Sequence, residues 1–173
     1  MAPDPEARLA AALSVALGGA TDAQRAIVRA ATDLRQAIGM RDAVRLAAAV
    51  EGERAALAGA AEAEATLRGA AGELAVALGL PASTALPTVI ALLARRGHGQ
   101  QAVVLAAGGQ ALATEVERAR QANAGNAVLL RQAIALTTLA LRHLTAGGGA
   151  VHTYTPAGLA SGAGPYRVLD ARA

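Results

Sequence analysis

Apolar residues recur at alternating four- and three-residue spacing through the middle of this chain, and this pattern restricts the fold more than any other feature. The repeat comprises Leu46, Val50, Glu53, Leu57, Ala60, Glu64, Leu67, Ala71, Leu74 and Leu78. A 4-3 alternation places side chains along one line of an α-helix and is typical of helices packed side by side. Glu53 and Glu64 interrupt the apolar line, and we expect both to face solvent.

The composition favours helices throughout the chain. Hydrophobic residues make up 54% of the sequence, most of them alanine, while aromatic residues make up 1%. Alanine has the highest helix propensity, and strands prefer the aromatic and β-branched residues that are scarce here. The sequence therefore predicts an all-α protein in which two long antiparallel helices, coiled-coil-like, carry short helical attachments.

Glycine, proline and capping residues suggest the helix boundaries. We expect a short helix over residues 7–17 that ends at Gly18 and Gly19. A long helix should then start at a Thr21 or Asp22 cap and end at Leu78. The phase of the repeat changes after Ile38, which predicts a bend or break near Gly39. Ser83 or Thr84 is expected to cap a short helix around residues 89–93, and the last helix is expected to span about residues 100–144. Residues 1–146 would form one helical bundle, and the Gly- and Pro-rich residues 147–173 a flexible tail.

Charge and residue usage exclude several classes of function. The net charge is only +3, and no basic stripe with interleaved aromatic residues is present, so we expect no nucleic-acid binding. The chain has no cysteine, and its first residues are acidic rather than basic, unlike a signal peptide. Pro81 and Pro87 break the uncharged run over residues 74–94, so we expect no stable membrane insertion. The absence of cysteine fits the cytoplasmic location that we expect.

The residues that enzymes and metal sites use are not arranged for either purpose. The three histidines, His98, His143 and His152, lack the Glu-x-x-His spacing of di-iron bundles and the four-residue spacing of zinc proteases. No serine lies in a Gly-x-Ser-x-Gly frame. We therefore expect no enzymatic activity, no catalytic residue, no metal and no cofactor, and we expect His98 simply to occupy a loop.

The last predicted helix carries two features that suggest a binding surface. Asn123 and Asn126 fall on its apolar line, where a polar residue costs stability and specifies register or partner, unless a small phase shift turns both toward water. The following residues are apolar over more than half of the circumference: Leu129, Leu130, Ile134, Leu136, Leu139, Leu141 and Leu144. Such a surface either binds a partner or is covered by the short helices expected near residues 7–17 and 84–94.

The run Asn123-x-x-Asn126-x-x-Leu129-Leu130, followed by the three glycines 147–149 and by Tyr154, resembles the FlgN-type flagellar export chaperones. The resemblance covers residues 45–158 and is most specific from Asn123 to Gly158. It implies a cytoplasmic chaperone that binds the terminal helices of hook-associated (hook-filament junction) proteins and delivers them to the type III export gate.

The resemblance also implies which residues make these contacts. The client-binding residues would be Asn123, Asn126, Leu129, Leu130, Ile134, Leu141 and Leu144. Tyr154 would dock the loaded chaperone on the gate, although Thr155 stands where the family has a glycine, which weakens this second assignment. The alternative left open by the composition is a coiled-coil coating or scaffolding protein, similar to the phasins of storage granules.

Overall fold

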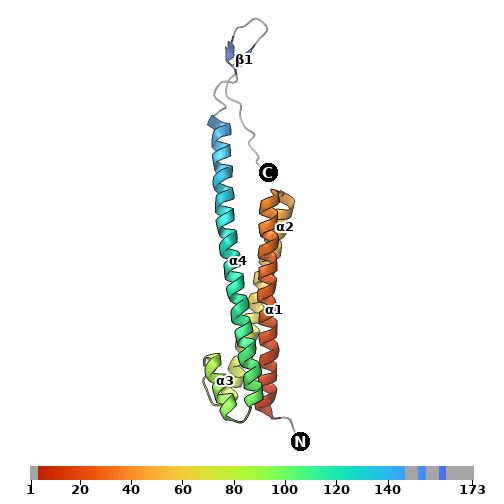
Figure 1. Ribbon diagram of the computed structural model, residues 1–173, viewed down its shortest axis with the longest axis vertical. Helices are drawn as coiled ribbons and strands as arrows, with labels where there is room; N and C mark the ends of the chain where they lie inside the picture. The colour runs from red at the N-terminus through yellow and green to blue at the C-terminus, as the bar shows by residue number, and fades with distance from the viewer. Residues whose placement is uncertain (1–3, 147–151, 155–159, 163–173) are drawn as a thin grey trace. The chain divides into compact units, whose positions relative to one another are not determined.

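The computed structural model describes residues 4–146, 152–154 and 160–162. Over these residues the chain forms the helices α1 (Pro5–Met40), α2 (Ala43–Ala77), α3 (Leu86–Arg95) and α4 (Gly99–Ala146) (Figure 1). Two three-residue strands, β1 (His152–Tyr154) and β2 (Ala160–Gly162), pair antiparallel. The all-α class with long antiparallel helices is confirmed. The other residues of the predicted tail, 147–151, 155–159 and 163–173, lie outside the described residues.

The chain divides into two compact units, residues 1–128 and 129–173. The first unit contains α1, α2, α3 and most of α4. The second unit begins inside α4 and includes the two strands. The predicted boundary between a helical bundle and a tail after residue 146 stays a prediction.

α1 is longer than the sequence suggested, because Gly18 and Gly19 do not end it. Asp4 caps its first turn by accepting a hydrogen bond from the Glu6 backbone N–H at 3.0 Å, and Pro5 occupies the start, where its missing N–H costs nothing. The predicted cap at Thr21 or Asp22 is wrong, because both residues lie inside α1. Thr21 is buried inside the helix, and its hydroxyl donates to the Leu17 carbonyl at 2.8 Å. Tertiary packing of the residues around the two glycines outweighs their poor helix propensity.

A turn at Arg41 and Asp42 separates α1 from α2. This confirms the break predicted near Gly39. The helix expected to reach Leu78 is therefore two helices. Arg41 adopts the left-handed conformation at φ 54°, and its N–H donates to the Ile38 carbonyl at 3.3 Å. The Asp42 carboxylate then accepts hydrogen bonds from the backbone N–H groups of Val44 and Arg45, at 3.0 and 3.1 Å. After this turn α2 runs back beside α1 (Figure 1). The signal for the break was therefore the capping aspartate rather than the glycine.

α2 ends as predicted, at Gly79. This glycine has φ 79°, and the Leu80 N–H donates back to the Ala75 carbonyl at 2.9 Å, which satisfies a carbonyl of the last turn. The predicted caps of α3 are wrong, because its N-cap is Ala85 and no side chain caps it. The Thr84 hydroxyl instead donates to the Pro81 carbonyl at 2.6 Å, within the loop.

The apolar core of the first unit lies where all four helices meet. It comprises Ala10, Leu13, Leu17, Leu74, Ala75, Leu78, Val89, Leu93 and Leu105. Farther along α1, Ile27, Ala31 and Leu34 follow each other at four- and three-residue spacing and are all buried. The repeat in α2 is buried only near its end, because α2 has no buried residue before Gly72. Upstream, Val50 and Leu57 remain 41% and 48% exposed, and Glu64 is exposed as expected while Glu53 is half-buried.

A polar cluster joins the start of α1 to the loop between α3 and α4. The Arg96 guanidinium donates to the Glu6 carboxylate at 2.8 Å and to the Leu78 carbonyl at 3.0 Å. His98 is half-buried, with its Nε2 3.2 Å from both the Asp4 and the Glu6 carboxylates. His98 therefore belongs to a contact between elements and does not merely occupy a loop.

Candidate functional site

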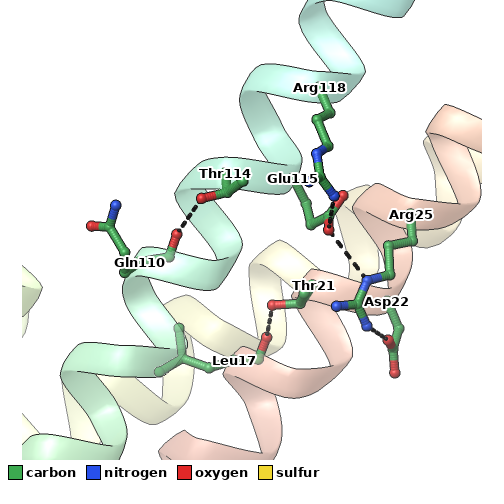
Figure 2. Close-up of polar contacts among 8 residues, drawn as sticks. All are labelled: Leu17, Thr21, Asp22, Arg25, Gln110, Thr114, Glu115 and Arg118. Carbon is green, nitrogen blue, oxygen red and sulfur yellow. Dashed lines mark hydrogen bonds and ion pairs between the residues drawn. The ribbon is translucent and has the colours of Figure 1, made fainter.

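α4 packs on α1 through contacts that advance in the same direction along both helices. Gly108 lies against Leu17, so that an added Cβ would be 3.3 Å from the Leu17 Cδ1 atom. Next along α4, the Glu115 carboxylate accepts from Arg25 Nε of α1 at 3.4 Å and from Arg118 Nη1 at 2.9 Å (Figure 2). Asn126 then contacts Ala31. The pairs 17–108, 25–115 and 31–126 therefore align the two helices in parallel.

Asn126 is the most deeply placed of the predicted site residues. Its side chain is buried, and its Nδ2 atom donates to the Ala31 carbonyl of α1 at 2.6 Å. The alternative in which both asparagines simply face water is therefore wrong for this residue, and half-buried Asn123 lies one turn away. The side-chain oxygens Asn123 Oδ1 and Asn126 Oδ1 are buried and accept no hydrogen bond from the protein. The pair forms a polar, incompletely satisfied contact at the α1–α4 interface.

The predicted leucines and isoleucine beyond Asn126 differ in their exposure. Leu129 and Leu130 are half-buried, whereas Ile134 is 65% exposed and Leu141 58% exposed. Leu136 and Leu139, which also face outward, are 65% and 52% exposed. Leu144 lies in the last turn of α4, and its side chain is outside the described residues.

The two segments that could have covered this surface are occupied elsewhere in the first unit. Residues 7–17 are part of α1, and Ala10, Leu13 and Leu17 are buried in the core described above. α3 contributes Val89 and Leu93 to the same core. Their apolar faces are therefore already covered by α2 and by the first turns of α4.

Tyr154 ends strand β1, where it pairs in register with Ala160 of β2. Nothing in the sequence analysis predicted this pairing. Thr155, Pro156 and Gly158, which follow it in the motif, lie outside the described residues.

Comparison with known proteins identifies the family. A family model described as "FlgN protein" matches residues 10–162. The chain belongs to the FlgN family. The match extends over nearly the whole chain, including α1, which the resemblance found in the sequence did not cover. No curated protein and no solved structure matches the chain.

Membership of the FlgN family establishes the general role of the chain, that of a flagellar export chaperone. FlgN proteins are a family of chaperones rather than enzymes, and they bind hook-associated proteins of the flagellum. The family match thus favours the chaperone interpretation over the coating protein that the composition alone left open.

One property of α4 bears on membranes. Among the described residues, one helix, Gly99–His143 within α4, is long and apolar enough to cross a membrane by length and composition alone. Only 6% of its most apolar 18-residue window is buried. Core helices of soluble proteins pass the same test of length and composition but are mostly buried, so the low burial is the notable property of α4.

Proposed function

We propose that this chain is a cytoplasmic type III export chaperone that binds the terminal helices of hook-associated proteins on the C-terminal part of α4 and delivers them to the export gate. The observation that carries the proposal is the exposure of large apolar side chains along this helix, with Ile134, Leu136, Leu139 and Leu141 all more than half exposed. Exposed apolar surface of this kind is typical of a partner-binding site.

Helix-to-helix burial is the interaction that this surface supports. An amphipathic client helix would place its apolar side chains against Leu129, Leu130, Ile134, Leu141 and Leu144, as helices do in hydrophobic grooves. Burying one such side chain contributes about 1.5–3 kcal/mol. Several of them together offset the cost of association, which is on the order of 4–15 kcal/mol.

Asn123 and Asn126 precede the exposed apolar residues in the sequence of α4. Asn126 ties α4 to the Ala31 carbonyl of α1 within the first unit. A polar residue in an apolar contact commonly specifies register in this way. We assign both asparagines a positioning role, and we assign Tyr154 to docking on the export gate.

Calorimetric titration with the hook-associated proteins of the same organism tests the proposal. We expect one-to-one binding to the intact clients and none to clients that lack their terminal helices. Ile134→Asp should weaken binding by at least about 100-fold, because a charge would be buried against apolar side chains, and far-UV circular dichroism should remain helical. The more buried Leu130→Asp should also abolish binding.

Val103→Asp is the matched control, since Val103 is 69% exposed on the same helix but far from the proposed site in sequence. Its client affinity should stay unchanged. Equal binding by Ile134→Asp and the parent chain would rule out the proposed surface. Tyr154→Ala should keep client affinity and reduce only export, as measured by client secretion from cells.

A further inference from the structure

The acidic and basic residues of this chain are unequally distributed. Up to Glu117 there are 12 acidic residues and 10 arginines, a net charge of −2, whereas from Arg118 onward there are 6 arginines and 1 aspartate, a net charge of +5. From Arg118 to Leu169 there is no acidic residue. The C-terminal part of α4 is therefore largely apolar, and all of its charged residues are basic.

The arginines of this part lie along one line of α4. Arg120, Arg131 and Arg142 are spaced by eleven residues, and all three are exposed. Eleven residues make slightly more than three whole turns, so each arginine is rotated by only about 20° from the previous one and lies about 16 Å farther along the axis. We call these three residues the arginine line.

Most of the large apolar residues occupy a separate arc of the same helix, while Leu139 lies outside it, about 80° beyond Arg131. At about 100° per residue, Leu129, Leu130, Ala133, Ile134, Leu136 and Leu141 cover an arc about 160° wide. We call these six residues the apolar arc. The arginine line borders the arc on the Ile134 side, with Arg131 about 60° from Ile134. Long arginine side chains can lie along an apolar surface while their charged ends reach polar groups at its edge.

We propose that, when no client helix occupies it, the apolar arc binds the surface of an anionic phospholipid bilayer, with the arginine line at the lipid phosphates. An apolar arc edged by basic residues and free of acidic ones is the pattern of helices that lie in the membrane interface. A packed helix in a globular protein needs a stripe of about 100° or more, so a single partner helix can leave part of the arc uncovered, whereas a bilayer can reach its exposed members Ile134, Leu136 and Leu141 together. The proposal rests on the proposed function, because it assigns the bilayer to the same apolar arc that binds the client helix.

Flotation of the full chain with vesicles provides the test. We expect binding to vesicles of phosphatidylcholine and phosphatidylglycerol in a ratio of roughly 70:30, weaker binding to phosphatidylcholine alone, and loss of binding between about 0.05 M and about 0.5 M salt. Leu136→Asp should lower the partition coefficient at least about tenfold, because it places a charge within the arc. Circular dichroism of the variant in the absence of vesicles checks that it remains folded.

Two triple variants with the same change in net charge separate the arginine line from charge in general. Replacing Arg120, Arg131 and Arg142 by glutamine should lower binding to the anionic vesicles about tenfold or more. Replacing Arg45, Arg54 and Arg68 of α2 by glutamine should change it less than about threefold, since their ion pairs are exposed and contribute little to stability. Equal losses in the two triple variants would overturn the proposal.

Three further outcomes would also overturn it. These are no binding to anionic vesicles at low salt, binding that Leu136→Asp leaves unchanged, and binding that saturating client does not displace. Salt-dependent binding to an acidic amphipathic peptide without any vesicle binding would assign the arginine line to an acidic protein instead. Failure of the proposed function is recognised separately, because clients would then show no calorimetric binding whether or not vesicles bind.

Discussion

The Asn126 side chain makes one hydrogen bond through its nitrogen and leaves its buried oxygen without a partner. Its Nδ2 atom donates to the Ala31 carbonyl, but its Oδ1 atom is buried without a partner, as is the Oδ1 atom of Asn123. A buried polar atom without a partner costs about 1–3 kcal/mol. The α1–α4 contact is therefore specific in register and weaker than an apolar contact of the same size would be.

Asn126→Asp should destabilise the protein by about 3 kcal/mol or more near neutral pH. The change keeps the shape of the side chain but removes the donor to Ala31 and buries an unpaired charge. Burial raises the pKa of the new carboxyl group in the folded state above its unfolded value of about 3.9. The folded variant then binds protons more tightly than the unfolded one, so the loss of stability is largest above the raised pKa and shrinks as pH falls toward about 4.

Urea unfolding followed by circular dichroism at pH about 7 and about 4 measures this effect, with the parent chain unfolded at each pH. The exposed Gln110→Glu is the control on the same helix and should change stability by less than about 0.5 kcal/mol. A loss for Asn126→Asp that is the same at both pH values would contradict the buried position of this side chain.

Gly108 and Gly109 are neighbours on α4 that should respond oppositely to alanine. A Cβ on Gly109 would meet only Leu86 Cδ2, at an ordinary 3.9 Å, whereas one on Gly108 would be 3.3 Å from the Cδ1 atom of fully buried Leu17. Gly109→Ala should therefore stabilise the protein by about 0.5–1 kcal/mol through helix propensity. Gly108→Ala should be at least about 1 kcal/mol less stable than Gly109→Ala, because the tightly packed Leu17 must move. Thermal and urea unfolding of the two variants, measured side by side, test the close approach of α4 to α1, and equal stabilities would contradict it.

At the scale of single elements, α2 departs most from its sequence pattern. Its 4-3 spacing runs from Leu46 to Leu78, yet α2 has no buried residue before Gly72. Leu46, Glu53, Ala60 and Leu67 are half-buried, but full burial occurs only near the end of the helix, where Leu74 and Leu78 enter the core. Periodicity thus determined which face of α2 is apolar, but not how far along the helix that face is covered.

The two parts of α2 should therefore differ in local stability. Native-state hydrogen exchange should give backbone amides of residues 47–69 an opening free energy about 2 kcal/mol below that of residues 72–77, because fewer buried apolar contacts resist their opening. Amides of α1 between Leu13 and Leu34, where buried residues recur throughout, serve as the internal reference. Uniform protection along α2 would show that its first part is covered by other residues.

The turn between α1 and α2 depends on one side chain. Asp42→Ala should lower the free energy of unfolding by about 1 kcal/mol, since the carboxylate caps the Val44 and Arg45 N–H groups. Asp33→Ala, at an exposed position inside α1, is the control and should cost less. Chemical denaturation measures both variants, and an equal effect would mean that the cap does not stabilise the turn.

At the scale of the whole molecule, stability and the proposed binding activity lie in different parts of the chain. The core joins α1, α2, α3 and the first turns of α4, with Leu105 contributed by α4. The exposed apolar residues Ile134, Leu136 and Leu141 belong to the second unit. Substitutions in the core should therefore unfold the protein, whereas substitutions at the exposed residues should leave it folded.

Leu105→Ala should reduce the free energy of unfolding by about 2–5 kcal/mol, because it leaves a cavity among fully buried side chains. Val103→Ala, at a 69% exposed position two residues away, should cost less than about 0.5 kcal/mol. Ile134→Ala should behave like Val103→Ala in unfolding experiments while weakening client binding. If Ile134→Ala destabilised the chain as much as Leu105→Ala, the residue would belong to the core and not to a binding surface.

The sequence by itself determined the fold class, the end of α2 at Gly79 and the apolar character of the last helix. Each of these depends on local chemistry: the helix propensity of alanine, the left-handed conformation open to glycine, and the 3.6-residue period that gathers apolar residues on one face. The motif around Asn123, Asn126, Leu129 and Leu130 also pointed to the family that the chain belongs to. The contacts of these residues with a client remain a proposal.

Only the tertiary structure decided that α1 continues through Gly18 and Gly19 and that Asn126 is buried against Ala31. The energies involved come from neighbours distant in sequence. Residues on both sides of Gly18 and Gly19 are buried by other helices, and the Asn126 hydrogen bond joins residues 95 positions apart. Periodicity shows which residues share a face of a helix, but which part of that face is covered depends on where the other helices lie.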